Sequence, residues 1–285
     1  MSFLCIDHVT YGYGETPVLN DINLTLEKGE VVSLLGPNGS GKTTLLKVLL
    51  GLCRPQKGEV RLEGRPVRHM NAKALARRVA YVPQTHKISF AYRVIDVVLM
   101  GRMPHKPFFF RYSKQDEDQA LEALEQLSIA HLKDRPYTEV SGGERQMTLI
   151  ARALAQGADI LVMDEPVSGL DYGNQIRLLA QIATLADNGY TFIKTTHFPE
   201  HAVWISDRVV MLKKGRLLAN GDALEVVNEE NLYLLYNTDI GMANLDEGLR
   251  VCVPRTMLDH VNKKKLSDSF NCFTPNPLRQ VSLTH

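Results

Sequence analysis

Residues 36 to 44 read GPNGSGKTT, and this stretch restricts the possible folds of the chain more than any other part of it. It follows a short apolar run, VVSLLG at 31–36, and leads into a helical pattern, TTLLKVLLG at 43–51. Glycines let such a loop wrap back, so that successive backbone N–H groups converge on phosphate oxygens, and the helix N-terminus adds its positive dipole end. The stretch fits G-x-x-x-x-G-K-[ST] with Gly36, Gly41, Lys42 and Thr43. The sequence therefore predicts a strand, a phosphate-binding loop and a helix in succession.

The loop predicts a nucleotide site rather than a glycine-rich turn without a ligand. A chance match in a chain of this length has a probability on the order of one per cent, and the flanking strand and helix lower it further. Lys42 is expected to neutralise the β- and γ-phosphates, and the Thr43 hydroxyl is expected to ligate Mg²⁺. The expected nucleotide contacts of the loop are Gly36, Pro37, Asn38, Gly39, Ser40, Gly41, Lys42, Thr43 and Thr44.

Short apolar, β-branched runs alternate with helical patterns along most of the chain. Strands are expected at 31–36, 79–84, 159–165 and 190–197, and helices at 43–51, 113–127, 144–156 and 172–186. This alternation predicts an α/β fold with a largely parallel central sheet. Residues 1–30 and 57–67 instead suit a small antiparallel sheet. Residues 208–221 predict a hairpin that turns at Gly215.

The remaining segments carry weaker signals. The stretch from about 86 to 150 has helical patterns without a clear strand, which predicts a helical insertion in the α/β core. Within it, Ser113 and Asp116 have the spacing of a capping box. Residues 241–285 are polar, proline-punctuated and aperiodic towards their end, which predicts a partly disordered extension.

The composition argues against several classes of protein. Thirty-three basic and 32 acidic side chains nearly cancel, so no overall field favours nucleic acid or an anionic membrane surface. The four cysteines are scattered, which favours reduced thiols over a disulfide framework or a zinc site. No basic segment opens a signal peptide, and no window of 18 apolar residues predicts a membrane span.

Polar residues follow the apolar runs at several predicted strand ends. Asp164 and Glu165 close ILVMDE, at the edge where open parallel sheets place their ligands. Asp164 suits an outer-sphere or water-mediated contact with Mg²⁺, and Glu165 suits a base that polarises an attacking water. Gln84 and His197 end two other strands, from which each can reach the γ-phosphate. The alternatives are solvated carboxylates and polar strand caps, which the phosphate loop makes less favourable.

A second anion-binding helix start is indicated by EVSGGERQM at 139–147. Two adjacent glycines are costly inside a helix. Directly after Ser141, however, Gly142 and Gly143 leave bare backbone N–H groups at a helix N-terminus, where an anion can bind.

In this order the motifs resemble those of the ATP-binding subunit of ABC (ATP-binding cassette) transporters, over roughly residues 3–230. The matching elements are the phosphate loop, the Q-loop glutamine Gln84, the signature VSGGE at 140–144, the Walker B strand ILVMDE, the D-loop SGLD at 168–171 and the switch histidine His197. The signature departs from the commoner LSGGQ at Val140 and Glu144, and the D-loop from SALD. The resemblance implies a P-loop NTPase cassette at 1–240, with a parallel core sheet, a small antiparallel β subdomain and a helical subdomain at about 86–150.

The resemblance also implies a head-to-tail pair of subunits, in which the signature of one completes the ATP site of the other. The signature residues expected to contact the partner's nucleotide are Ser141, Gly142, Gly143 and Glu144. Asp171 would link the two sites. Tyr13 would stack on adenine, with Tyr11 as the alternative.

Within one subunit, the family pattern implies that Thr43, Gln84 and Asp164 hold Mg²⁺ with the phosphates. Glu165 would act as the base, and His197 would hold the attacking water and the γ-phosphate. Hydrolysis would then wait for the dimer to close, because catalysis here is mainly positioning and charge stabilisation.

A single cassette without a membrane span implies an importer subunit, since exporters usually fuse permease and ATPase in one chain. Residues 90–106 resemble the region after the Q-loop in ATPases of vitamin B12, iron–siderophore, haem and some molybdate importers. There Phe90, Tyr92 and Val94 would be exposed and would receive the permease. The alternative is an ordinary amphipathic surface helix.

The expected function is therefore ATP-driven uptake of a metal chelate, such as an iron–siderophore, haem or cobalamin. Molybdate or tungstate import is the alternative, and a non-transport ABC ATPase acting on nucleic acid or ribosomes is the rival from another class. The implied partners are a second copy of the chain, an integral permease and, indirectly, a substrate-binding protein, without nucleic acid. The implied location is the cytoplasmic face of the inner membrane, as a peripheral subunit.

Overall fold

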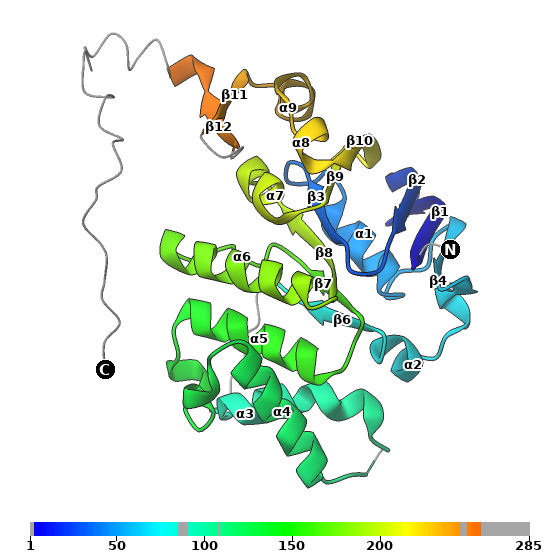
Figure 1. Ribbon diagram of the computed structural model, residues 1–285. Helices are drawn as coiled ribbons and strands as arrows, with labels where there is room; N and C mark the ends of the chain where they lie inside the picture. The colour runs from blue at the N-terminus through cyan, green and yellow to red at the C-terminus, as the bar shows by residue number, and fades with distance from the viewer. Residues whose placement is uncertain (1–2, 85–90, 108, 246–249, 258–285) are drawn as a thin grey trace, which may run out of the picture.

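A six-stranded sheet runs through the middle of the molecule in the order β10-β9-β3-β8-β7-β6 (Figure 1). The computed structural model describes residues 3–84, 91–107, 109–245 and 250–257. The strands are β3 (Val31–Leu35), β6 (Val79–Val82), β7 (Ile160–Met163), β8 (Thr191–Thr196), β9 (Arg208–Lys213) and β10 (Arg216–Asp222). All are parallel except β10, which pairs with β9 as a hairpin. This confirms the expected parallel core and the hairpin at Gly215, whose φ of 75° suits a glycine.

The buried strands are apolar on both faces because each face is covered. On β7, Leu161 and Met163 pack into one core cluster, whereas Ile160 and Val162 pack into the other. This is the period-2 alternation of strand side chains. A parallel sheet covered on both sides reads as a continuous apolar run, which is why ILVM was recognisable as a strand.

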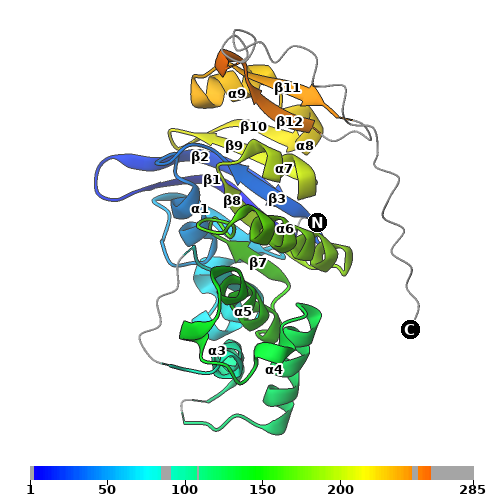
Figure 2. The same ribbon diagram turned by 90° about the vertical axis from the view of Figure 1, so that its left-hand side faces the viewer.

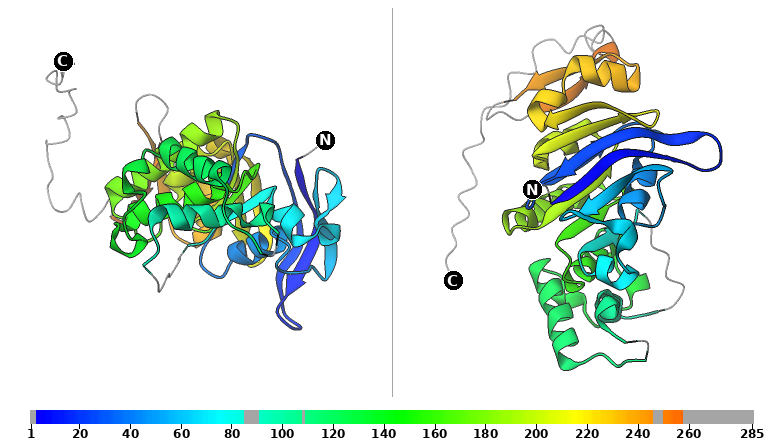
Figure 3. Two further views of the ribbon diagram at one scale, coloured as in Figure 1. Left: turned by 90° about the horizontal axis from the view of Figure 1, so that it is seen from below. Right: turned by 90° about the vertical axis from the view of Figure 1, so that its right-hand side faces the viewer.

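One face of this sheet is covered by the N-terminal part of the chain. An antiparallel sheet in the order β2-β1-β4-β5 confirms the expected small antiparallel unit. Its strands are β1 (Leu4–Gly12), β2 (Pro17–Leu26), β4 (Lys57–Leu62) and β5 (Arg65–Pro66). Helix α1 (Lys42–Leu49) packs in the same core cluster, and α2 (Ala72–Ala76) precedes β6. The β1–β2 hairpin projects beyond the body of the molecule (Figure 3, right).

The other face is covered by helices, which extend to one end of the molecule (Figures 1 and 2). They are α3 (Val94–Leu99), α4 (Lys114–Gln126), α5 (Gly142–Ala155) and α6 (Tyr172–Asp187). The capping box at α4 is confirmed, because the Ser113 side chain accepts from Asp116 N and the Asp116 carboxylate accepts from Ser113 N. None of the described helices has the length and apolarity needed to cross a bilayer.

The docking surface expected after the Q-loop is only partly present. Tyr92 is exposed, but Val94 is fully buried at the start of α3, where it belongs to the core between α3, α4 and α5. The expectation that Val94 faces a partner is therefore wrong. Its apolar side chain fills the interior of the helical segment instead. Phe90 lies outside the described residues.

A C-terminal unit lies at the opposite end of the molecule from α3 and α4 (Figure 2). It comprises α7 (Pro199–Ile205), α8 (Ala223–Val226), α9 (Glu229–Tyr236) and a hairpin of β11 (Ile240–Asn244) and β12 (Arg250–Pro254). A third core cluster joins this unit to β9 through residues such as Met211, Leu232 and Leu235. The sequence patterns did not indicate this hairpin, which occupies the start of the extension predicted at 241–285 to be partly disordered; residues 258–285 lie outside the described residues. The domain boundary at 240 stays a prediction.

A buried lysine in β8 yields a prediction about stability. Lys194 is 1% exposed and donates a hydrogen bond from Nζ to the His201 carbonyl oxygen at 3.3 Å. Burial lowers its pKa from 10.5 to about 7. Between these two values the unfolded chain binds more protons than the folded one, so the free energy of unfolding falls as the pH is lowered through this window.

We expect Lys194→Met to raise the free energy of unfolding near neutral pH by on the order of 3 kcal/mol, because it removes the cost of a buried cation. The gain should shrink as the pH approaches 10.5, where folded and unfolded lysine are both increasingly neutral. Urea unfolding at neutral and at alkaline pH measures both effects. Lys57→Met, at an exposed position, is the matched control. A gain that does not depend on pH would contradict this account.

Candidate functional site

The phosphate loop needs its glycines for both conformation and space. Gly41 is the N-cap residue of α1 and has φ 107°, a left-handed value that favours glycine. At Gly36, a Cβ atom would lie 2.3 Å from the Leu212 carbonyl oxygen of β9. The loop backbone is therefore pressed against the neighbouring strand at Gly36, where a side chain has no space.

Lys42 reaches back over the loop that carries it. Its Nζ donates to the carbonyl oxygens of Gly36 at 2.6 Å and Pro37 at 3.1 Å. Burial lowers the pKa of Lys42, and the carboxylates of Glu165 and Asp164 oppose this shift. The ammonium group is thus held between the loop backbone and the acids at the end of β7, where an incoming phosphate would compete for it.

The cavity above the loop has a volume of about 420 Å³. It is lined by Val18, Asn38, Gly39, Ser40, Gly41, Lys42, Thr43, Thr44, Gln84 and Glu165. Residues predicted from three separate parts of the sequence therefore lie around one space. The signature residues and Asp171 do not line this cavity.

Two tyrosines lie near the β1–β2 turn, and their environments differ. Tyr13 is 57% exposed, and its ring meets that of Tyr11 edge-on at 5.1 Å. Tyr11 packs against the core, and hydrogen bonding to Cys53 raises its pKa to about 12. Only Tyr13 of the two presents most of its ring to solvent, as stacking on a base requires.

Asp164 and Glu165 are fixed by Thr195, a residue that the sequence analysis missed. Its hydroxyl donates to Asp164 Oδ1 at 2.7 Å and accepts from the Glu165 backbone N–H at 2.7 Å. Asp164 Oδ1 also accepts from the Thr43 hydroxyl at 3.3 Å. Thr195 lies two positions before His197 on β8, so strand alternation would have placed both on one side of the sheet.

The Glu165 carboxylate lies at the centre of a polar cluster. Gln84 Nε2 donates to Glu165 Oε2 at 3.0 Å, and His197 Nδ1 lies 3.5 Å from Oε1 without the alignment of a hydrogen bond. Glu165 itself has φ 44°, which is uncommon for a residue other than glycine. Such a conformation persists only when its surroundings hold it, and it is typical of functional sites. The geometry suits a base with room for a water beside it.

The signature forms the exposed start of α5. Ser141 is the N-cap residue: its Oγ accepts from Glu144 N at 3.3 Å, and Glu144 Oε2 accepts from Ser141 N at 2.7 Å. These bonds lower the pKa of Glu144 and commit its carboxylate to the helix end. Ser141 and Gly142 are exposed. A Cβ at Gly142 would make ordinary contact with Leu170 at 3.5 Å, whereas one at Gly143 would lie 2.8 Å from the Asn174 side chain.

The D-loop connects this helix start to the cluster at Glu165. At one end, the Ser168 hydroxyl accepts from Gln84 Nε2 at 3.2 Å. At the other end, Asp171 caps α6 by accepting from Asn174 N at 2.9 Å and from Asn174 Nδ2 at 2.6 Å. These bonds lower the pKa of Asp171. Ser168 was named as part of the D-loop, but its contact with Gln84 and the role of Asn174 were not predicted, because no local pattern marks contacts between distant segments.

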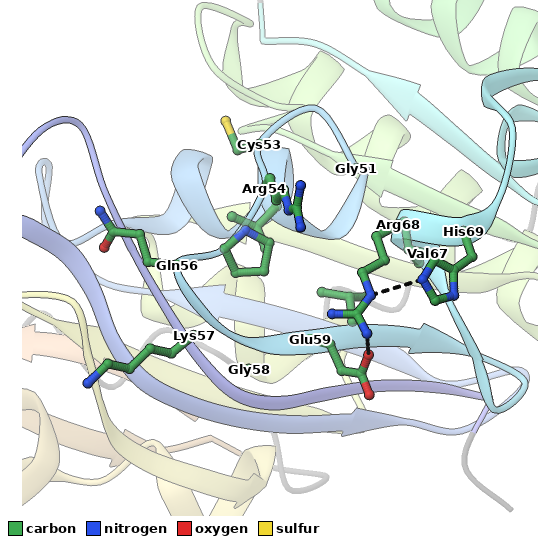
Figure 4. A pocket seen from close by; sticks show the side chains of 13 residues that line it. Gly51, Cys53, Arg54, Gln56, Lys57, Gly58, Glu59, Val67, Arg68 and His69 are labelled. Carbon is green, nitrogen blue, oxygen red and sulfur yellow. Dashed lines mark hydrogen bonds and ion pairs between the residues drawn. The ribbon is translucent and has the colours of Figure 1, made fainter.

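A larger groove, of about 860 Å³, lies at the opposite end of α1 from the phosphate loop (Figure 4). Cys53, Arg54, Lys57, Glu59, Arg68 and His69 are among its lining residues. The Glu59 carboxylate pairs with Arg61 at 2.6 Å and Arg68 at 3.5 Å. The groove shares no lining residue with the cavity above the loop.

Comparison with known proteins gives consistent matches. The ABC transporter family model matches residues 19–168. The chain is 42% identical to an uncharacterised ABC transporter ATP-binding protein of Haemophilus influenzae over 81% of this chain and 88% of the relative. It is 35% identical to the iron(3+)-hydroxamate import ATP-binding protein FhuC of Bacillus subtilis over 84% and 89%, respectively. It is also 35% identical to the molybdate import ATP-binding protein MolC of Haemophilus influenzae over 82% and 88%.

The fold is also similar to that of a solved ABC transporter structure. It is an inward-facing transporter assigned to the metal-chelate type, and its ATP-binding chain superposes with a TM-score of 0.80 at 33% identity. The match covers 90% of this chain and 99% of that chain.

Proposed function

The chain belongs to the ABC transporter family and is an ATP-binding, ATP-hydrolysing subunit; on that premise we propose that it energises uptake of a metal chelate through a separate membrane permease. The observation that carries the catalytic part is that Gln84 and His197 converge on Glu165, which lines the cavity above the phosphate loop. The cargo rests on the importers among its relatives, in particular FhuC and the metal-chelate type structure.

The proposed roles follow from the geometry of the site. The loop from Gly36 to Thr44 binds the phosphates of ATP through its backbone N–H groups, and Lys42 moves from its carbonyl partners to the β- and γ-phosphates. Tyr13 stacks on adenine. Glu165 accepts a proton from the attacking water, and His197 contacts the water and the γ-phosphate.

The residues present fit a magnesium ion. Thr43 Oγ1 and Asp164 Oδ1 are hard oxygen ligands that already lie 3.3 Å apart, and Thr43 and Gln84 both line the cavity above the loop. One carboxylate is sufficient, because in nucleotide sites phosphate oxygens and water provide most of the ligands of Mg²⁺. When bound, the ion would neutralise charge that develops on the phosphates.

We propose a head-to-tail homodimer as the working unit. Ser141 and Gly142 are exposed and lie outside the wall of the cavity that holds Lys42. A helix start with free backbone N–H groups suits the γ-phosphate of a nucleotide on a second subunit. The Glu144 carboxylate caps this helix end, and Gly143 allows it to lie close to Asn174. Asp171, in the adjoining D-loop, accepts a hydrogen bond from Asn174 N.

The proposed location is the cytoplasmic face of the membrane, where the helical segment α3–α5 contacts the permease and a substrate-binding protein acts from the other side. The test is reconstitution in vesicles with a candidate permease of the metal-chelate importer type. We expect iron–siderophore, haem or cobalamin bound to the cognate binding protein to stimulate ATP hydrolysis. Stimulation by molybdate alone would select the alternative cargo. Stimulation by nucleic acid without a permease would overturn the transport proposal.

A further inference from the structure

The C-terminal unit holds the main chain at the switch histidine. Tyr236, the last residue of α9, donates a hydrogen bond from its hydroxyl to the His197 carbonyl oxygen at 3.2 Å. The two residues are 39 positions apart in the chain. Burial raises the pKa of Tyr236, so its hydroxyl remains a proton donor throughout the neutral range.

A second connection runs through a row of aromatic rings in tilted contact. The ring of His197 lies 4.1 Å from that of Phe198, Phe198 lies 4.8 Å from His201, and His201 lies 5.4 Å from Trp204. At the end of the row, Trp204 Nε1 donates to the Arg250 carbonyl oxygen of β12 at 3.3 Å. The loop that carries His197 is therefore tied to both α9 and the hairpin.

The C-terminal unit is itself well packed, so it can serve as a support. Leu232 and Leu235 of α9 are buried in the core cluster shared with β9, and Tyr236, Met242 and Cys252 pack against that cluster. The Glu229 carboxylate accepts from Met242 N at 2.9 Å, which joins the start of α9 to β11. In Figure 2, α9 and the β11–β12 hairpin lie together beyond α7.

We propose that Tyr236 is a positioning residue for ATP hydrolysis, which sets the place of His197 from outside the nucleotide site and so makes the rate depend on the C-terminal unit. Tyr236 does not line the cavity above the phosphate loop, so it acts through the main chain of residue 197. This proposal rests on the role proposed above for His197. Small errors in the position of a group that contacts the reacting atoms are costly in rate, whereas ATP affinity depends on the phosphate loop.

The test is Tyr236→Phe in the full-length chain assembled with its permease. We expect kcat for ATP hydrolysis to fall about five-fold, because one hydrogen bond to the His197 carbonyl is lost. KM for ATP should be unchanged, since no loop contact is altered. The matched control is Tyr233→Phe on the same helix, where the tyrosine is 54% exposed. We expect this control to match the wild type in both constants.

Trp204 is the single tryptophan of the chain, so the emission of each purified full-length variant, measured before assembly with the permease, reports the packing of the C-terminal unit. A loss of kcat in Tyr236→Phe that only follows the unfolded fraction seen by Trp204 would overturn the proposal. Equal kcat in Tyr236→Phe and Tyr233→Phe would overturn it as well. His197→Ala distinguishes a failure of the proposed role of His197 in hydrolysis from a failure of the positioning role of Tyr236. If His197→Ala is inactive while Tyr236→Phe is normal, only the positioning role fails. If His197→Ala hydrolyses ATP normally, the role of His197 fails first.

Discussion

Glu165→Gln is expected to lower the rate of ATP hydrolysis by at least about 100-fold, the range in which a general base contributes. The amide keeps the size of the carboxylate but is a very weak base. ATP binding should survive, because the phosphate loop and Lys42 are untouched. The variant should therefore accumulate as an ATP-bound dimer. Hydrolysis rates and ATP-dependent size-exclusion chromatography measure the two effects.

A matched control exists because Glu63 has the same unusual backbone conformation, with φ 47° against 44° for Glu165. Glu63 pairs with Arg78 at 2.9 Å and does not line the cavity above the loop. Glu63→Gln makes the same chemical change at an exposed ion pair, where the effect on stability is small. It should hydrolyse ATP like the wild type. Near wild-type hydrolysis by Glu165→Gln would show that another group is the base.

The sheet and the phosphate loop were predictable because their signals are local. A buried parallel strand appears as an uninterrupted apolar run such as ILVM, and the loop appears as fixed glycine, lysine and threonine positions. Asp164, Glu165, Gln84 and His197 could be placed near one another because parallel strands bring their carboxyl ends to the same edge of a sheet. Distances within that group, such as 3.0 Å from Gln84 to Glu165, required the structure.

The errors and omissions concern residues whose environment is set by distant parts of the chain. Val94 lies in FAYRVIDVV, near a predicted docking surface, yet the packing of α3 against α4 and α5 buries it completely. Tyr236 and Thr195 resemble ordinary strand or helix residues in the sequence. Tyr236 is bonded to the His197 carbonyl and Thr195 to Asp164 and Glu165, and residues far apart in sequence form these contacts only in the folded chain.

Gly142→Asp is expected to leave the fold and ATP binding intact while it lowers ATP hydrolysis by about 100-fold or more. The glycine has no positive φ, and a Cβ there meets Leu170 at an ordinary 3.5 Å. An aspartate in the first turn of α5 is also favoured by the helix dipole. The same carboxylate would repel a γ-phosphate brought to this helix start by a partner. Thermal unfolding, nucleotide binding and hydrolysis rates distinguish these effects. Gly143→Asp, by contrast, should displace the Asn174 side chain, whose Oδ1 would lie 2.8 Å from the added Cβ, and so disturb its hydrogen bond to Asp171.

Mixing two inactive variants tests whether each ATP site is shared between subunits. Lys42→Ala damages the phosphate loop, and Gly142→Asp damages the signature. In a head-to-tail dimer of one chain of each kind, the intact loop of one faces the intact signature of the other, so one site is complete. Equal mixtures with random exchange should regain up to about a quarter of the wild-type sites, since half of the dimers are mixed and each has one complete site. If the signature instead served the loop of its own chain, every site in the mixture would carry a defect and no activity would return.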